Sequence, residues 1–113
     1  MNQTRGTTLA DRADIANTAE TRNTGLLKHS SLEQGEGLWI VPCQSIHMFF
    51  MKFSIDVVFL DKQKKILKIR HNLGKWRIAM SLGARSVLEL PAGTLAATKT
   101  VVGDQLEFEK YEA

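Results

Sequence analysis

The chain has 113 residues and a formal net charge of +3, with 43% apolar and 24% charged residues. This length gives room for one domain, and the composition excludes an intrinsically disordered chain. The longest largely apolar run, residues 46–51, is far shorter than the roughly 20 residues that cross a bilayer. Because the polar N-terminus lacks the apolar stretch of a signal peptide, we expect a cytoplasmic protein with no membrane association.

Cysteine and glycine usage limits the cofactor chemistry that we expect. Cys43 is the single cysteine, so an intramolecular disulfide and a multi-cysteine metal site are excluded. Cys43 and His47 are four residues apart, but no further pair with suitable spacing would complete a zinc site. No glycine-rich phosphate loop is present. We therefore predict neither a metal nor a cofactor.

The N-terminal part is predicted to hold a flexible end, a strand and a helix. Residues 1–8 are polar and are expected to be flexible, and residues 9–113 to form a single globular domain. Loose alternation over residues 9–15 predicts a first strand.

A helix is predicted next. Asn17 and Glu20 have the spacing of a capping box, and the helix is expected to reach about Lys28. The pair Leu26–Leu27 is predicted to face the core.

From residue 38 onward, apolar residues recur with the period of two that is typical of strands. Asp56–Leu60 gives the strongest prediction, because it is rich in β-branched and aromatic residues. His47–Phe53 is largely apolar on both faces, which predicts a strand buried on both sides. Further strands are predicted at 38–41, 65–73, 76–80, 86–90 and 105–109, with a short helix or helical turn at 92–99.

These elements predict the fold class. Most of the strands are joined by short turns, so antiparallel pairing should dominate. We expect an α+β, β-rich fold: a small antiparallel barrel or a two-layer roll of about six to eight short strands, with one helix in the N-terminal half.

Four polar residues interrupt the most apolar strands or flank them. Lys52 and Asp56 flank residues 53–55, and Glu89 lies between two leucines, on the opposite strand face from both. A buried charge that has no partner reduces the stability of the folded protein by roughly several kcal/mol. Lys52, Asp56, Glu89 and His47 therefore either form structural ion pairs or line a pocket, and the sequence leaves both readings open.

Two other features, the Cys43–His47 spacing and the turn at Pro91–Thr94, can each be interpreted as functional or as structural. Cys43 and His47 could form a catalytic pair, although an inert cysteine and a hydrogen-bonded histidine explain them as well. The turn at Pro91–Thr94 enters a predicted helix whose N–H groups could hold an anion, although Gly93 is also explained by chain reversal alone.

A basic segment lies between Lys62 and Arg77, where no acidic residue occurs. Such a segment could bind nucleic acid, but stacking aromatic residues usually accompany the cations, and here Trp76 is the single one. The charges alternate with apolar residues, which is typical of the solvated face of an edge hairpin. The basic residues are Lys62, Lys64, Lys65, Lys68, Arg70, Lys75 and Arg77.

Several motifs together resemble the domain of unknown function 192 family, over about residues 9–108. They are Cys43-Gln-Ser-Ile-His47, Met51-Lys-Phe-Ser-Ile-Asp56-Val-Val-Phe-Leu-Asp61 and Val87-Leu-Glu-Leu-Pro-Ala-Gly93-Thr94, preceded by Arg22-Asn-Thr-Gly25-Leu26-Leu27 and Gly37-Leu-Trp-Ile and followed by Val102-Gly103-Asp104. The resemblance implies a compact β-rich domain with a helix near the N-terminus, and it implies no activity.

The chain departs from the family's usual pattern at three positions. Met48 stands where threonine is common, Ser54 where proline is common, and Lys52 where arginine is frequent. Lysine keeps the charge but lacks the bidentate fork of arginine, which weakens the case for a carboxylate clamp at Lys52.

The leading hypothesis is a non-enzymatic domain that binds a small ligand or a protein partner. The second is an enzyme that uses His47 as an acid–base group with Cys43 or Asp56. The third is a weak nucleic-acid binder that uses the basic 62–77 hairpin. No oligomeric state is predicted. The candidate binding residues are His47, Lys52, Asp56, Glu89, Arg22 and Cys43.

Overall fold

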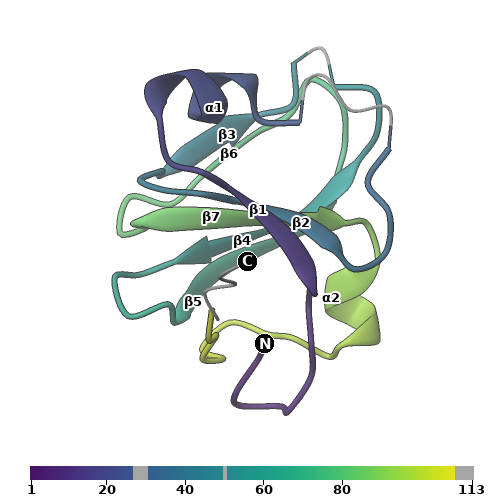
Figure 1. Cartoon of the computed structure of the whole chain (residues 1–113), viewed down its shortest axis with the longest axis vertical. Coiled ribbons are helices and arrows are strands. Elements are labelled where there is room, and N and C mark those ends of the chain that lie inside the picture. Colours follow the sequence, from purple (N-terminus) through teal and green to yellow (C-terminus); the bar gives the residue numbers. More distant parts are fainter. Residues whose placement is uncertain (27–30, 50, 109–113) are drawn as a thin grey trace.

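The computed structural model of this protein describes residues 1–26, 31–49 and 51–108 (Figure 1). The described residues form two short helices and seven strands, and the strands belong to two sheets. Their bounds are β1 (Arg12–Ala16), α1 (Ala19–Thr24), β2 (Glu36–Ile40), β3 (Ser45–His47), β4 (Ile55–Leu60), β5 (Ile66–Leu73), β6 (Ile78–Met80), β7 (Ser86–Pro91) and α2 (Thr94–Ala97).

A five-stranded sheet in the order β1-β2-β7-β4-β5 forms the centre of the molecule. β1 pairs with β2 in parallel, whereas the other neighbours are antiparallel, as the short connections predict. β4 has a neighbouring strand on each side and all of its residues are buried. This burial explains why its sequence is apolar on both faces.

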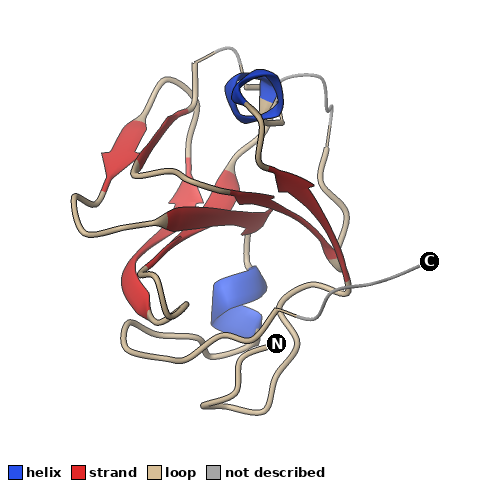
Figure 2. Cartoon of the chain, turned by 60° about the vertical axis from the view of Figure 1, so that its left-hand side comes forward, coloured by secondary structure: helices blue, strands red, loops and turns tan. Residues whose placement is uncertain are grey.

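The sheet is covered on both faces (Figure 2). On one face, Val57 and Phe59 pack with Leu26, which follows α1, and with Ile46 of β3, which forms a separate two-stranded sheet with β6. On the other face, β4 packs with Leu95 of α2. The α+β, β-rich fold class is thus confirmed. Of the two architectures considered, the described strands form the two-layer roll, because the sheets do not close into a barrel.

The predicted strand over His47–Phe53 is wrong for most of its length. β3 ends at His47. The Met51 N–H then donates to the Met48 carbonyl, 3.3 Å away, which turns the chain. Met48 and Met51 are nevertheless buried, so this apolar pattern records a loop packed into the core rather than a strand. Phe50 lies outside the described residues.

α1 is shorter than predicted, and a different residue caps it. Thr18 is the N-cap and forms the capping box with Thr21, where Asn17 and Glu20 were expected. The helix ends at Thr24, while the predicted end at Lys28, like Leu27, lies outside the described residues. Leu26 is buried, as predicted.

The predicted last strand is also wrong as a strand. Gln105 and Leu106 form only isolated bridges, to Lys65 and to Asn2 respectively, and Glu109 lies outside the described residues. A continuous strand does not form because the two residues pair with different segments of the chain.

The N-terminal segment makes more contacts than a flexible end would suggest. Asn2 is fully buried, and its side-chain amide donates to the Asp104 carboxylate at 2.9 Å and to the Thr100 hydroxyl at 3.2 Å. These contacts oppose the flexibility expected of residues 1–8, which stays a prediction that amide hydrogen exchange at Asn2 would test.

Candidate functional site

A pocket of about 390 Å³ is lined by residues of α1, β2, β3 and β7 and of the loops next to them. It brings together four of the six candidate binding residues, Arg22, Cys43, His47 and Glu89, from segments far apart in the sequence. Apolar side chains form much of the remaining wall. The other lining residues are Asn23, Thr24, Gly25, Leu26, Ile40, Pro42, Ser45, Ile46 and Met51.

Glu89 is the buried polar residue of this pocket. It lies in β7 opposite Leu38 of β2 and Val57 of β4, so its side chain shares the apolar sheet face that supports α1. It is only 5% exposed. Within the described part of the chain, no hydrogen-bond donor or basic group pairs with its carboxyl. Burial raises the pKa of Glu89 to about 7 from the usual 4.5, because a carboxylate is poorly stabilised away from water.

Arg22 supplies a positive charge to the same pocket. Its guanidinium group is held by long hydrogen bonds from Nη1 to the carbonyls of Asn17, at 3.4 Å, and Val41, at 3.5 Å. Among the described residues, the salt bridges join only Arg5 to Asp104 and Arg12 to Asp11. Arg22 and Glu89 therefore line one pocket without pairing with each other.

Cys43 and His47 are both in the pocket lining but do not form an activated pair. The Cys43 thiol donates to the Ser45 carbonyl at 3.1 Å. Burial has the largest effect and raises the pKa of Cys43, and the Glu89 charge also raises it; together they outweigh the lowering by the Ser45 backbone and by the charge of Arg22. The thiol is thus the favoured form, whereas the thiolate is the nucleophile. His47 is exposed, with its ring 5.1 Å from that of Phe49.

Asp56 is not part of this pocket. It is buried, and its carboxylate accepts from the N–H groups of Asn72 at 2.8 Å, Gly93 at 3.1 Å and Leu95 at 2.9 Å. The helix-start N–H groups considered for an anion therefore bind the carboxylate of Asp56 itself. This carboxylate joins β4 to β5 and to the start of α2, which is a structural role.

Lys52 also lies outside the pocket lining. Its side chain is exposed, and no ion pair joins it to Asp56 although both residues are described. The structure thus separates Lys52 and Asp56 from the four residues that share the pocket.

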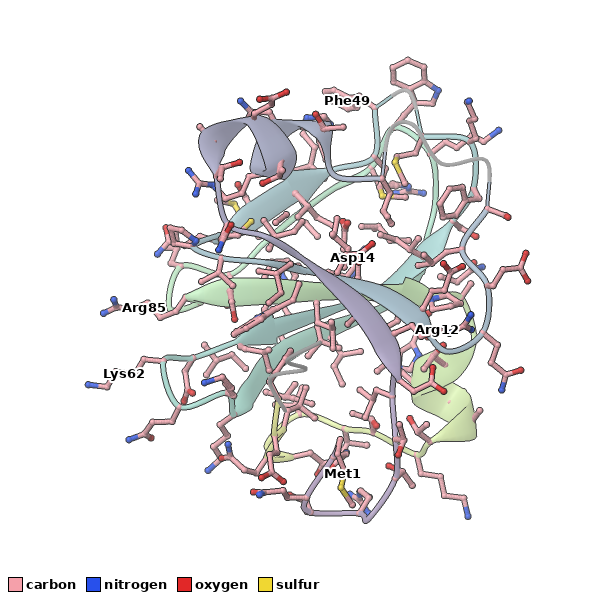
Figure 3. The ribbon with its side chains drawn as sticks, in the orientation of Figure 1. Met1, Arg12, Asp14, Phe49, Lys62 and Arg85 are labelled. Atoms are coloured by element: carbon pink, nitrogen blue, oxygen red, sulfur yellow. The ribbon has the colours of Figure 1, made fainter. Side chains whose placement is uncertain are left out.

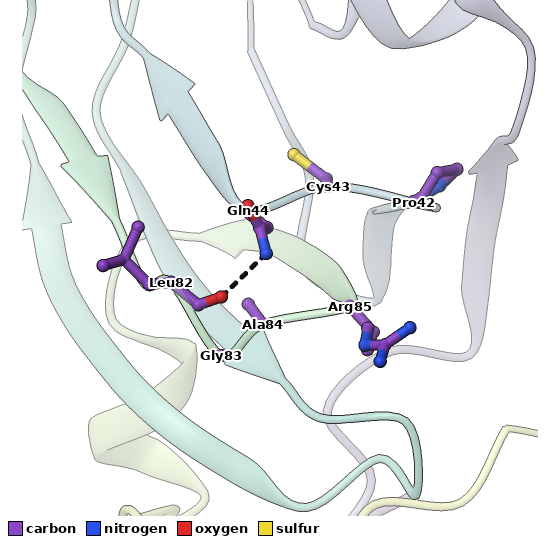
Figure 4. A pocket seen from close by; sticks show the side chains of 7 residues that line it. All are labelled: Pro42, Cys43, Gln44, Leu82, Gly83, Ala84 and Arg85. Carbon is purple, nitrogen blue, oxygen red and sulfur yellow. Dashed lines mark hydrogen bonds between the residues drawn. The ribbon is translucent and has the colours of Figure 1, made fainter.

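A second pocket, of about 420 Å³, lies on the other side of Cys43 (Figure 4). Gln44 closes part of it by donating from Nε2 to the Leu82 carbonyl at 2.7 Å. Arg85 is its one charged residue. The described residues offer no cluster of three or more His, Cys, Asp or Glu side chains that could hold a metal ion.

Sequence reasoning missed the apolar wall of the Glu89 pocket. Leu26 was assigned only to the core, Ile40 only to a strand and Ile46 only to an apolar run, yet all three line the pocket. The alternation of side chains between the two faces of a strand could have indicated this wall. Leu38 and Ile40 share one face of β2, and Glu89 lies on that face of the sheet. Placing α1 over this face required the tertiary structure.

Comparisons with known protein sequences identify relatives of this chain. The chain is 31% identical to a UPF0127 protein of Thermococcus sibiricus, over 99% of this chain and 75% of the relative. It is 38% identical over 77 residues to UPF0127 protein PYRAB11210 of Pyrococcus abyssi, which covers 63% of this chain and 65% of the relative.

Two solved structures share the fold. A protein of unknown function from Novosphingobium aromaticivorans has a TM-score of 0.77 at 21% identity, over 85% of this chain and 74% of that chain. A putative transcription regulator from Sinorhizobium meliloti has a TM-score of 0.78 at 24% identity, over 84% of this chain and 79% of that chain.

In the described part of the chain, neither helix is long and apolar enough to cross a membrane. The model of the DUF192 family, described as uncharacterized ACR, matches residues 1–108. With this match over nearly the whole chain, the protein belongs to the DUF192 family.

Proposed function

We propose that this protein is a small ligand-binding domain whose pocket takes a molecule that donates a hydrogen bond, or a positive charge, to Glu89. The observation that carries the proposal is the carboxyl of Glu89, which lines the pocket in a side chain only 5% exposed and has no hydrogen-bond donor among the described residues. A ligand with an ammonium, amide or hydroxyl group would supply the missing donor.

The shape and chemistry of the pocket support this proposal. Its volume of about 390 Å³ lies within the range of small-molecule sites, and apolar side chains with a few polar groups are typical of such sites. Leu26, Ile40 and Ile46 offer apolar contact, while Arg22 could hold an anionic or carbonyl group of the same ligand. The unpaired Cys43 supports a cytoplasmic location, which is part of the proposal.

Binding is favoured over catalysis by the state of Cys43 and His47. A Cys–His mechanism needs a thiolate next to its base. Here the thiol bonds to a backbone carbonyl, and burial raises its pKa. Catalysis by these two residues would require the pocket to rearrange.

The test is a titration followed by NMR, with butylammonium as the probe and butyrate as its anion of matched size. We expect millimolar butylammonium to shift resonances around Ile40 and Ile46, because a fragment this small binds weakly. Replacing Glu89→Gln should weaken this binding about tenfold, since it removes the negative charge. Glu107→Gln, an exposed change, should leave it unaltered. Equal shifts by butyrate, or an unchanged affinity in Glu89→Gln, would exclude the proposal.

A further inference from the structure

β6 and its flanking residues present an apolar stripe to solvent. Trp76, Ile78, Met80 and Leu82 are 61%, 60%, 50% and 78% exposed, whereas the intervening Ala79 is only 3% exposed. In a strand with one buried face, the outward positions are usually polar. Here both outward residues of β6, Ile78 and Met80, are large and apolar, and Trp76 and Leu82 in the turns on either side add to them, which is the pattern of a binding surface rather than of scattered surface residues. We call these four residues the β6 stripe.

The neighbouring strand widens the β6 stripe. Ser45 and His47 of β3 lie opposite Met80 and Ile78, so they share its outward face. The His47 ring is 5.1 Å from that of Phe49, and the Phe49 ring is 5.7 Å from that of Trp76, which makes a row of three rings across the end of the small sheet. Figure 3 places Phe49 at the α1 end of the molecule. The surface is therefore a patch and not a single row.

The surroundings of the β6 stripe are basic. Lys75 and Arg77 flank Trp76 in the chain, and the Lys68 ammonium donates to the Met80 carbonyl at 2.8 Å. Arg85, whose side chain extends away from the ribbon in Figure 3, follows the far end of the stripe along the chain. No acidic residue occurs from Lys62 to Leu88. A second copy of this chain would bring like charges together, whereas an acidic partner would be attracted.

We propose that the β6 stripe and its basic surroundings are a docking surface for an extended, acidic segment of another polypeptide with apolar residues at alternate positions. Alternate side chains of a strand lie about 6.6 Å apart, and Ile78 and Met80 are alternate residues of β6, so an extended segment can place alternate apolar side chains against these two residues. Its acidic residues would then face the flanking lysines and arginines. This proposal does not involve Glu89: Ser45 and His47 border both the pocket and this surface, but none of the residues altered in the test below lines the pocket.

The test uses fluorescence anisotropy with a labelled peptide of alternating Glu and Leu, about 12 residues long so that it spans the β6 stripe. Matched peptides carry Lys in place of Glu, or Ser in place of Leu. We expect the Glu-Leu peptide to bind at least about tenfold more tightly than either of them, and raised salt to weaken the binding. Ile78→Ser/Met80→Ser and Lys75→Glu/Arg77→Glu should each reduce its affinity by about tenfold or more.

Matched variants separate this surface from general stickiness. Val101→Ser/Val102→Ser removes two other exposed apolar side chains, and Lys99→Glu reverses a charge beyond α2; both should bind the peptide like the unmodified protein. The altered side chains are exposed, so the fold is retained, which circular dichroism checks. Three results would overturn the proposal: equal binding by all variants, a dimer that Ile78→Ser/Met80→Ser dissociates, or binding to phosphatidylserine vesicles without binding to the peptide.

Discussion

Glu89→Gln should make the protein more stable at neutral and basic pH. The carboxyl lies in an apolar environment in the folded state, where burial raises its pKa to about 7 from the usual 4.5. Unfolding returns it to water, so the unfolded chain releases this proton more readily than the folded chain. The carboxyl therefore costs no stability below about pH 4.5, and the cost grows as the pH rises towards 7. Above that pH the cost levels off at about 3 kcal/mol.

Urea unfolding of both proteins across this pH range measures the effect. The difference in unfolding free energy, variant minus unmodified protein, should be small near pH 4.5 and should increase to at most about 3 kcal/mol near pH 8. Other ionisable groups cancel in this difference, because both proteins share them. The glutamine amide also stays buried without a full set of partners, which lowers the gain equally at all pH values.

Glu107→Gln is the control for the loss of one acidic group, since its side chain is exposed. It should change the pH profile of unfolding little. A difference for Glu89→Gln that does not vary with pH would refute the reasoning, because the carboxyl would then titrate alike in both states. A difference that falls with rising pH would show that the carboxylate has a stabilising partner.

Three further predictions follow from other contacts. Asp56→Asn should cost about 2 to 4 kcal/mol in urea unfolding, because the carboxylate accepts from three backbone N–H groups; the exposed Asp14→Asn should cost little, and an equal cost for both would contradict the structural role. Gly37→Ala should cost about 1 to 3 kcal/mol in the same assay, because its added methyl group would lie 3.2 Å from the Glu89 carbonyl; an unchanged stability would show that β2 and β7 can separate locally. Cys43 should react with iodoacetamide more slowly than free cysteine at neutral pH, because burial raises its pKa. Glu89→Gln should speed the reaction by removing a nearby negative charge. Mass spectrometry follows the adduct, and an equal rate in the two proteins would show that Glu89 does not affect the Cys43 thiol.

Several strands could be predicted because they depend on a local pattern of residues. Asp56–Leu60 was predicted because β-branched and aromatic residues occupy the three positions after the aspartate, and the period of two over 65–73 and 86–90 similarly predicted β5 and β7. Local pattern failed at 47–53, where two buried methionines in a turn imitate a strand. Buried loops and buried strands share an apolar composition, so periodicity alone does not separate them.

The same limit applies to the candidate site. The sequence showed that Asp56 and Glu89 are charged residues within apolar strands, and both are buried. Their different roles follow from the segments that the fold places beside each carboxyl group. Asp56 faces α2, whose first N–H groups satisfy it, while Glu89 faces the pocket beside α1, where no described group does. Whether a buried charge is structural or available to a ligand depends on donors brought from distant segments, and a single sequence does not record those distances.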